Sequence, residues 1–282
     1  MKTACDIKLL LSDVDGTLVT HDKVLTEGAR AAAVGLRQAG IGLALTSARP
    51  PRGMRMLVEP LDLRLPLAGF NGGLIVDPDF KVLESHPIDP KAAHEAVRLL
   101  RDNGLDIWVY TETAWFVTAQ DGPHVAREAW IIKTQPEAAA LADADLARAF
   151  KIVGVCDDHA KVAAAEAPIQ QKLGDTASAT RSEPHFLDIT HPKATKGFVV
   201  HSLSRRLGLP PGQIATIGDM PNDVLMFAES GFSIAMGNAS DAVKARASAV
   251  TDTNEDDGFA KAVRRFLLQP DAASPLKSWS AP

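Results

Sequence analysis

The sequence has few of the residues that mark secreted or membrane-embedded proteins. Its 282 residues contain only two cysteines, Cys5 and Cys156, which are too few for a disulfide framework and lack the spacing of a metal site. Two reduced thiols are typical of a cytoplasmic protein, and we expect that location. No apolar run approaches the roughly 20 residues of a membrane span, and the first residues lack the apolar core of a secretory signal. The small and polar stretch 269–282 is expected to be a frayed tail.

The chain also lacks an excess of basic residues. Its 30 Lys and Arg stand against 35 Asp and Glu, which gives a formal net charge of -5. Nucleic acids and anionic membranes require concentrated positive charge, so we expect neither as a partner. A small anionic ligand stays compatible with this balance, because a few local cations suffice to bind it. The length suits one large α/β domain or two domains, as a monomer or a small homo-oligomer.

Strand and helix patterns alternate in the first and last parts of the chain. Nearly continuous apolar runs predict strands that are covered on both faces, and the segments between them have helical spacing. Such strand–helix repeats predict an α/β fold with a doubly wound parallel sheet. We expect strands at 7–13, 41–47, within 65–76, at 213–219, 231–237 and 248–253, and helices at 27–38, 50–58, 196–208, 221–230, 241–247 and 256–268.

The pattern changes from about residue 86. Neighbouring strands joined by minimal turns indicate antiparallel pairing, and therefore a separate α+β domain. We expect helices at 90–104, 123–133 and 160–173, and strands at 105–112, 114–120, 151–158, 176–183 and 185–190. The simplest organisation is a core domain formed by 1–85 and 191–282, interrupted by an inserted α+β cap at 86–190.

Polar residues follow several strands of the predicted core sheet. In a parallel sheet, ligands bind at the carboxyl ends of the strands. Each of these residues alone has an ordinary explanation, such as a turn or a helix cap. Their joint occurrence at strand ends has no such ordinary explanation. The residues are Asp13, Asp15, Ser47, Arg49, Asp219, Asn222 and Asp223, with Lys196 at the start of the helix that leads into the last of these strands.

At least three of these carboxylates would crowd one small volume. Two unit charges about 4 Å apart repel by about 4 kcal/mol at an effective dielectric near 20. A hard divalent cation removes that repulsion, and oxygen ligands without His or Cys select Mg²⁺. The sequence therefore predicts a Mg²⁺ site at this edge of the sheet.

Four short stretches resemble, in order, the motifs of the haloacid dehalogenase-like superfamily of hydrolases. They are "DVDGT", "TSAR", "TKG" and "GDMPND". The run "FNGG", the inserted domain and the stretch "FSIAMGNASDAVKARA" resemble the Cof-like (type IIB) branch, and the likeness covers nearly the whole chain. It implies a Rossmann-like core with a cap that sets substrate specificity. Ala48 stands where the branch usually has Gly, so both Thr46 and Ser47 are candidates for the phosphate-binding hydroxyl, and we favour Ser47.

The resemblance implies a role for each core motif. Asp13 is expected to attack phosphorus and form an aspartyl-phosphate, and Asp15 to act as general acid and then general base. Lys196 and Ser47 are expected to hold the phosphoryl oxygens. The expected metal ligands are Asp13, the main-chain carbonyl of Asp15, Asp219 and, either directly or through water, Asp223, with Asn222 orienting them.

Substrate contacts are less sharply indicated. We expect Asn71, Gly72 and Arg49 to contact the substrate from the core, and Arg181 and His185 from the cap. Trp108, Glu112 and Trp115 are further candidates for the cleft, and core packing or solvent exposure is the ordinary alternative for each cap residue.

The leading hypothesis is a Mg²⁺-dependent phosphatase that acts on small phosphorylated metabolites, with sugar phosphates favoured. A phosphotransferase or mutase on the same scaffold is the alternative, because an aspartyl-phosphate can pass to a second hydroxyl. A phospho-accepting signalling module also pairs acids, a hydroxyl and a lysine, but it expects a much shorter chain.

Overall fold

The computed structural model describes residues 6–138 and 140–268, so Cys5 and the stretch 269–282 lie outside the described residues. The chain forms two compact units. The first comprises the described residues of Met1–Leu43 and Leu209–Pro282, and the second comprises Ala44–Gly208. Strand β2 (Gly42–Thr46) crosses the boundary and therefore belongs to both units.

The first unit contains strands in the order β14-β13-β12-β1, which pair in parallel, and β2 follows β1 in the same sheet. Its strands besides β2 are β1 (Leu9–Ser12), β12 (Ile214–Gly218), β13 (Phe232–Ala235) and β14 (Ala249–Val250). Strands β1 and β12 pair in parallel register, with Leu9 opposite Ile214, and both are buried along their whole length. Burial on both faces explains why these strands are continuous apolar runs in the sequence.

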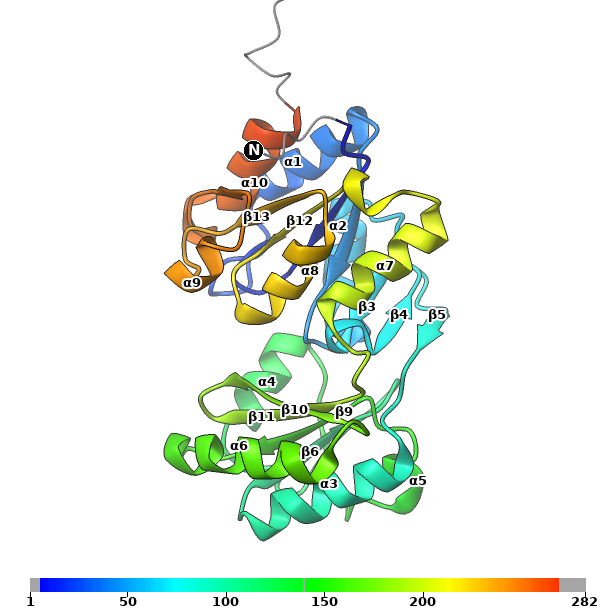
Figure 1. Ribbon diagram of the computed structural model, residues 1–282, viewed down its shortest axis with the longest axis vertical. Helices are drawn as coiled ribbons and strands as arrows, with labels where there is room; N and C mark the ends of the chain where they lie inside the picture. Colours follow the sequence, from blue (N-terminus) through cyan, green and yellow to red (C-terminus); the bar gives the residue numbers. More distant parts are fainter. Residues whose placement is uncertain (1–5, 139, 269–282) are drawn as a thin grey trace, which may run out of the picture. The chain divides into compact units, whose positions relative to one another are not determined.

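Helices flank this sheet. They are α1 (Glu27–Gln38), α8 (Val224–Glu229), α9 (Asp241–Lys244), α10 (Gly258–Ala262) and the π-helical stretch Val263–Leu268, with 3-10 turns at Pro211–Gln213, Pro221–Asp223 and Asn254–Asp256. Helix α1 has the predicted bounds, begins with the Thr26 side chain accepting the N–H of Ala29, and lies against α10 (Figure 1). Gly40 follows the end of the helix at φ +73°, and a glycine in this left-handed conformation commonly terminates a helix.

The second unit contains two sheets. In one, β2 pairs in parallel with β3 (Leu67–Gly69), and β4 (Leu74–Val76) and β5 (Val82–Ser85) continue in antiparallel order. The other has the order β10-β11-β9-β6-β7-β8, antiparallel except between β7 and β8. Its strands are β6 (Asp106–Tyr110), β7 (Trp115–Val117), β8 (Glu137–Ala138), β9 (Lys151–Val155), β10 (Ser178–Glu183) and β11 (Phe186–Thr190).

The helices of the second unit are α2 (Arg55–Leu61), α3 (Pro90–Asp102), α4 (Val125–Ile132), α5 (Asp143–Leu146), α6 (His159–Leu173) and α7 (Lys196–Leu207), with 3-10 turns η1 (Pro51–Met54) and η2 (Phe70–Gly72). Among the described residues, no helix has the length and apolar composition needed to cross a membrane.

The six-stranded sheet has two different faces. Helices α3 and α6 cover one face (Figure 1), where alternate residues such as Ile107 and Val109 join their apolar core. The intervening positions face the other way because successive side chains of a strand alternate. We call this second side the aromatic face, and its residues include Asp106, Trp108, Tyr110, Trp115, Val117, Lys151, Val153, Val155, Phe186, Asp188 and Thr190.

The α/β fold class is confirmed, and most predicted elements lie within a few residues of the observed bounds. Strands β5 and β8 and helix α5 were not predicted, because β5 and β8 are largely exposed and all three are short. The helix predicted to end at about 58 starts as a 3-10 turn and continues to Leu61. All strands of the six-stranded sheet lie within 86–190, whereas the two compact units divide elsewhere, so the predicted domain bounds stay a prediction.

Three histidines gather near the start of β11. The rings of His124 and His185 stack with centroids 3.8 Å apart, and the His159 ring lies 6.1 Å from that of His185. Asp157 Oδ1 lies 2.8 Å from His124 Nε2, and Glu183 Oε2 lies 3.2 Å from His185 Nε2. Burial and the two neighbouring histidines lower the pKa of His185, and the two carboxylates only partly oppose them. The folded protein therefore favours neutral His185.

This lowered pKa predicts a loss of stability in mild acid. The unfolded chain binds a proton at His185 more readily than the folded chain, so the contribution of the ring is complete above about pH 6.5 and is lost as the pH falls below it. We expect the fall in melting temperature between pH 7.5 and pH 5.5 to be smaller by about 2 °C in His185→Asn than in the unchanged protein. An equal change in the exposed control His94→Asn would contradict this assignment.

Candidate functional site

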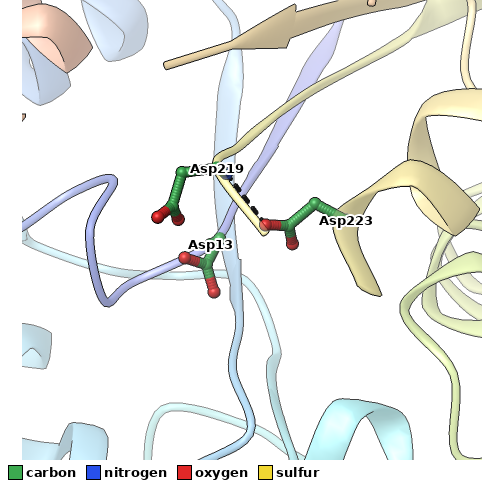
Figure 2. Close-up of side chains that lie close together, drawn as sticks. All are labelled: Asp13, Asp219 and Asp223. Atoms are coloured by element: carbon green, nitrogen blue, oxygen red, sulfur yellow. Dashed lines mark hydrogen bonds between the residues drawn. The ribbon is translucent and has the colours of Figure 1, made fainter. Parts of the chain in front are cut away.

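Three carboxylates meet at the carboxyl ends of β1 and β12. Asp13 directly follows β1, Asp219 directly follows β12, and Asp223 ends the 3-10 turn beyond it. One carboxylate oxygen from each residue lies within 4.8 Å of those of the other two (Figure 2). The residues are only 4%, 8% and 0% exposed, respectively. The strand-end rule thus correctly predicted that these three acids would come together.

The surrounding backbone and side chains fix two of these carboxylates. Asp223 Oδ2 accepts the backbone N–H groups of Asp219, at 2.9 Å, and Met220, at 2.8 Å. Asp219 Oδ1 accepts the Thr17 hydroxyl at 3.0 Å, and its Oδ2 accepts Asn238 Nδ2 at 3.2 Å. The sequence reasoning missed Thr17 and Asn238, although Thr17 lies within the "DVDGT" stretch and Asn238 follows β13, the strand next to β12.

Two glycines allow the carboxylates to lie against the main chain. A Cβ atom at Gly16 would overlap the Asp219 carboxylate, and one at Gly218 would overlap Asp223. Gly16 also has φ +75°, which side-chain-bearing residues rarely adopt. Both positions therefore require glycine if the three carboxylates are to keep this arrangement.

The donor set of this group fits a divalent metal. Three buried carboxylates that share so small a volume repel one another strongly, and a cation relieves that repulsion. All three donors are oxygen atoms, which suit a hard cation better than zinc or copper. Within the described parts of the chain, this is the one group of three or more His, Cys, Asp or Glu side chains with such spacing.

Asp15 lies beside this group in sequence but in a different environment. Its carboxylate is 33% exposed and forms an ion pair with Lys23, whose Nζ lies 2.7 Å from Asp15 Oδ1. The loop between them folds back on itself, because Asp15 forms an isolated bridge with Val19 and the Thr20 N–H donates to Val24. Sequence reasoning did not predict the contact with Lys23, since a loop gives no periodic signal that relates the two residues.

In the second unit, Ser47 and Asn71 lie at the ends of neighbouring strands. The Ser47 hydroxyl accepts the Arg49 N–H at 3.1 Å, and its main-chain carbonyl accepts the Asn71 N–H at 2.8 Å. Thr46, by contrast, is completely buried within β2, and its hydroxyl has no hydrogen-bond partner among the described residues. The Ser47 hydroxyl thus lies beyond the end of β2, whereas the Thr46 hydroxyl is enclosed within the sheet.

A tight turn brings the start of α7 to the same region of the second unit. Gly72 has φ +103°, and a Cβ there would lie 2.7 Å from the Val199 side chain and 3.2 Å from Thr195 O. The Thr195 side chain caps the helix by accepting the Phe198 N–H at 3.1 Å. The next residue, Lys196, is only 2% exposed. The second unit therefore gathers Ser47, Asn71, Gly72 and Lys196.

The other residues predicted to contact substrate have different surroundings. The Arg49 guanidinium donates to the carbonyls of Gly53 and Ile131, each at 3.1 Å, and so holds the last turn of α4, whose carbonyls lack helical partners. Arg181 pairs with Glu166 of α6 at 2.8 Å, on the helix-covered side of its sheet. His185 stacks on His124. The structure thus gives each of these side chains a structural contact, and their roles in substrate binding stay predictions.

The cap aromatic residues are placed in the interior. Trp108 and Trp115 are 2% and 1% exposed, respectively, and their rings form an edge-to-face pair with centroids 5.2 Å apart. Glu112 is exposed.

Comparison with known proteins agrees with this geometry. The family model of haloacid dehalogenase-like hydrolases matches residues 10–263. A putative phosphatase of Haemophilus influenzae is 28% identical over 90% of this chain and 95% of its own length. The 5-amino-6-(5-phospho-D-ribitylamino)uracil phosphatase YcsE of Bacillus subtilis is 26% identical over 93% of this chain and 97% of its own length.

A solved haloacid dehalogenase-like hydrolase from Bacteroides thetaiotaomicron has a similar structure. It superposes with a TM-score of 0.84 at 27% identity, and the match covers 92% of this chain and 99% of that one. The family model spans both units and includes all three acids of the buried group. The chain therefore belongs to the haloacid dehalogenase-like hydrolase family.

Proposed function

We propose that the chain is a Mg²⁺-dependent phosphohydrolase that removes phosphate from small phosphorylated metabolites, with sugar phosphates favoured, through an aspartyl-phosphate. The observation that carries this proposal is the buried group of Asp13, Asp219 and Asp223, in which Asp13 follows the first strand of a chain that belongs to a hydrolase family. The names of the relatives point the same way. The phosphoribityl compound in the name of the Bacillus subtilis relative is a phosphorylated polyol.

The metal would be held by the carboxylates of Asp13, Asp219 and Asp223 and by the main-chain carbonyl of Asp15. When bound, it supplies positive charge that offsets the negative charge of both Asp13 and the phosphoryl group. Asp223 is suited to this task because two backbone N–H groups fix its carboxylate, and Asp219 because Thr17 and Asn238 orient it. Asn222 would support this arrangement from the same turn.

The reacting groups would divide the chemistry between them. Asp13 would attack phosphorus with one carboxylate oxygen. Asp15, which is partly exposed and paired with Lys23, would donate a proton to the leaving oxygen and later remove one from the attacking water. The contact with Lys23, at 2.7 Å, would hold the Asp15 carboxylate in place for both proton transfers.

Ser47 and Lys196 would bind the phosphoryl oxygens. Ser47 directly follows β2, and ligands of parallel sheets bind at the carboxyl ends of the strands. A lysine that is 2% exposed keeps its charge only near negative groups, which suits a phosphate-binding role. Asn71 and Gly72 lie beside Ser47 and α7 within the second unit, and would contact the substrate near its phosphate.

Hydrolysis of p-nitrophenyl phosphate tests the proposed reaction. We expect release of p-nitrophenol with Mg²⁺, complete loss of it with excess chelator, and a fall in kcat of at least about 1,000-fold in Asp13→Asn, because the amide is not a nucleophile. Asp102→Asn, an exposed residue paired with Arg98, is the matched control and should retain full activity. Undiminished turnover by Asp13→Asn would exclude the covalent route.

Gly16→Ala tests whether the contact between backbone and carboxylate shapes the metal site. The added methyl group would displace Asp219, so we expect the rise in melting temperature on adding Mg²⁺ to disappear. Gly40→Ala is a matched control for backbone strain, since Gly40 has φ +73° but no described atom within 4 Å of a Cβ. A normal Mg²⁺ response in Gly16→Ala would show that the site does not depend on this contact.

Ser47→Ala and Thr46→Val separate the two candidate hydroxyls. Loss of a phosphoryl-binding donor should lower kcat/KM by about 100-fold in Ser47→Ala. Thr46→Val removes a buried hydroxyl without a partner, so it should leave activity within about twofold and raise the melting temperature slightly. The reverse pattern would assign the hydroxyl to Thr46.

A further inference from the structure

A buried ion pair lies in the middle of the aromatic face. Lys151 Nζ lies 2.7 Å from Asp188 Oδ2, and the two side chains are 13% and 7% exposed. They stand on the neighbouring strands β9 and β11, where Lys151 is opposite Thr190 and Asp188 is opposite Val153. Burying two charges among aromatic and aliphatic side chains is costly, and packing alone would favour apolar residues of similar size. The pair therefore calls for an explanation beyond stability.

Tyr110 lies next to the ion pair on the same face of the sheet. Tyr110 is opposite both Lys151 on β9 and Trp115 on β7, so the three side chains form one row across the sheet. The Tyr110 hydroxyl donates to Glu128 Oε1 at 3.0 Å and is therefore already engaged. Burial and the Glu128 carboxylate hold the pKa of Tyr110 well above its ordinary value, so this hydroxyl stays neutral.

Two buried polar groups of this face have no hydrogen-bond partner among the described residues. One is the indole N–H of Trp115, a residue that is 1% exposed. The other is Oδ1 of Asp188, a residue that is 6% exposed and whose Oδ2 pairs with the ammonium group of Lys151. Buried groups of this kind are rare and usually mark the place of a ligand or an ordered water.

The pair also lies close to the turn that carries Asn71. The ring of Phe70 stacks on that of Phe150 with centroids 5.7 Å apart, and it lies 6.0 Å from the ring of Tyr110. Phe150 directly precedes Lys151, and Phe70 directly precedes Asn71, whose N–H donates to Ser47. Within the second unit, a short series of contacts thus joins the main chain of Ser47 to the ion pair.

We propose that Lys151, Asp188 and the Trp115 indole N–H bind hydroxyl groups on the leaving group of a phosphorylated sugar or polyol. This inference rests on the proposed function. A hydroxyl both donates and accepts, so it can donate to Asp188 while it accepts from Lys151 or Trp115. A carboxylate or a second phosphate could only accept, and Asp188 would repel it. The ion pair is neutral as a whole, which favours a neutral polar group over a charged one.

The test compares leaving groups that differ only in their hydroxyls. Sorbitol 6-phosphate carries hydroxyls along a six-carbon chain, n-hexyl phosphate has the same chain without them, and p-nitrophenyl phosphate reports on the phosphate chemistry. We expect the unchanged protein to have a kcat/KM at least about 30-fold higher for sorbitol 6-phosphate than for n-hexyl phosphate, since unpaired buried groups penalise the analogue without hydroxyls.

Two variants assign that preference to the aromatic face. The double substitution Lys151→Met with Asp188→Asn removes both charges together, because loss of one partner alone leaves an unpaired buried charge that can unfold the protein. We expect it to raise the KM for sorbitol 6-phosphate about 10- to 100-fold, and Trp115→Phe to raise it about fivefold. KM for n-hexyl phosphate and turnover of p-nitrophenyl phosphate should change less than about threefold. Trp130→Phe is the control for loss of an indole, because Trp130 is 49% exposed.

Each other result overturns the inference. An equal loss on all three substrates by variants with normal melting temperatures would make the pair a structural element. Unchanged kinetics would mean that ordered water satisfies these groups. Equal use of sorbitol 6-phosphate and n-hexyl phosphate by the unchanged protein, with p-nitrophenyl phosphate hydrolysed normally, would reject the substrate class but leave the proposed function intact. Only failure to hydrolyse any of the three would reject both.

Discussion

The repulsion among three buried carboxylates is the constraint on which the rest of the structure depends. Asp13, Asp219 and Asp223 come from two adjacent parallel strands and the turn that follows one of them, and all are shielded from water. Backbone N–H groups, a hydroxyl and an amide orient Asp219 and Asp223 and stabilise their negative charge. Three like charges so close together attract a cation, which lowers the repulsion among them. This is why the buried group, rather than any single motif, carries the functional proposal.

The two units bury charge in opposite ways, and the difference has a chemical meaning. The group in the first unit consists of like charges, so it attracts a cation and, through it, an anionic phosphoryl group. The Lys151–Asp188 pair in the second unit is neutral overall, so its remaining hydrogen-bonding capacity suits neutral polar groups. The net charge of each group thus distinguishes the two sites. The negatively charged group suits the phosphoryl group that all phosphorylated metabolites share, and the neutral pair suits the leaving group, which differs between them.

Sequence reasoning predicted the features that periodicity and strand ends determine. Strand β1 was found because Leu9, Leu10 and Leu11 give a continuous apolar run, and the three acids because the ends of parallel strands adjoin. Thr17, Asn238 and the Asp15–Lys23 pair were missed, since hydroxyl, amide and loop contacts have no period. The Lys151–Asp188 pair was also out of reach, because it depends on the register between β9 and β11, which no local pattern fixes. The contact of Arg49 with Ile131 was also missed, because it joins segments far apart in the sequence, and the predicted contact of Arg49 with substrate stays a prediction.

The unsatisfied groups of the aromatic face also explain how such an enzyme could select among many phosphorylated compounds. Every substrate of a phosphatase offers the same phosphoryl group, so contacts to that group cannot discriminate. Asp188 and Trp115 are already desolvated before any ligand arrives, and the cost of their burial is part of folding. A leaving group with correctly placed hydroxyls recovers that cost, while one without them leaves it in place. Selectivity then arises from the rejection of compounds that lack hydroxyls, and it requires no movement of the catalytic carboxylates.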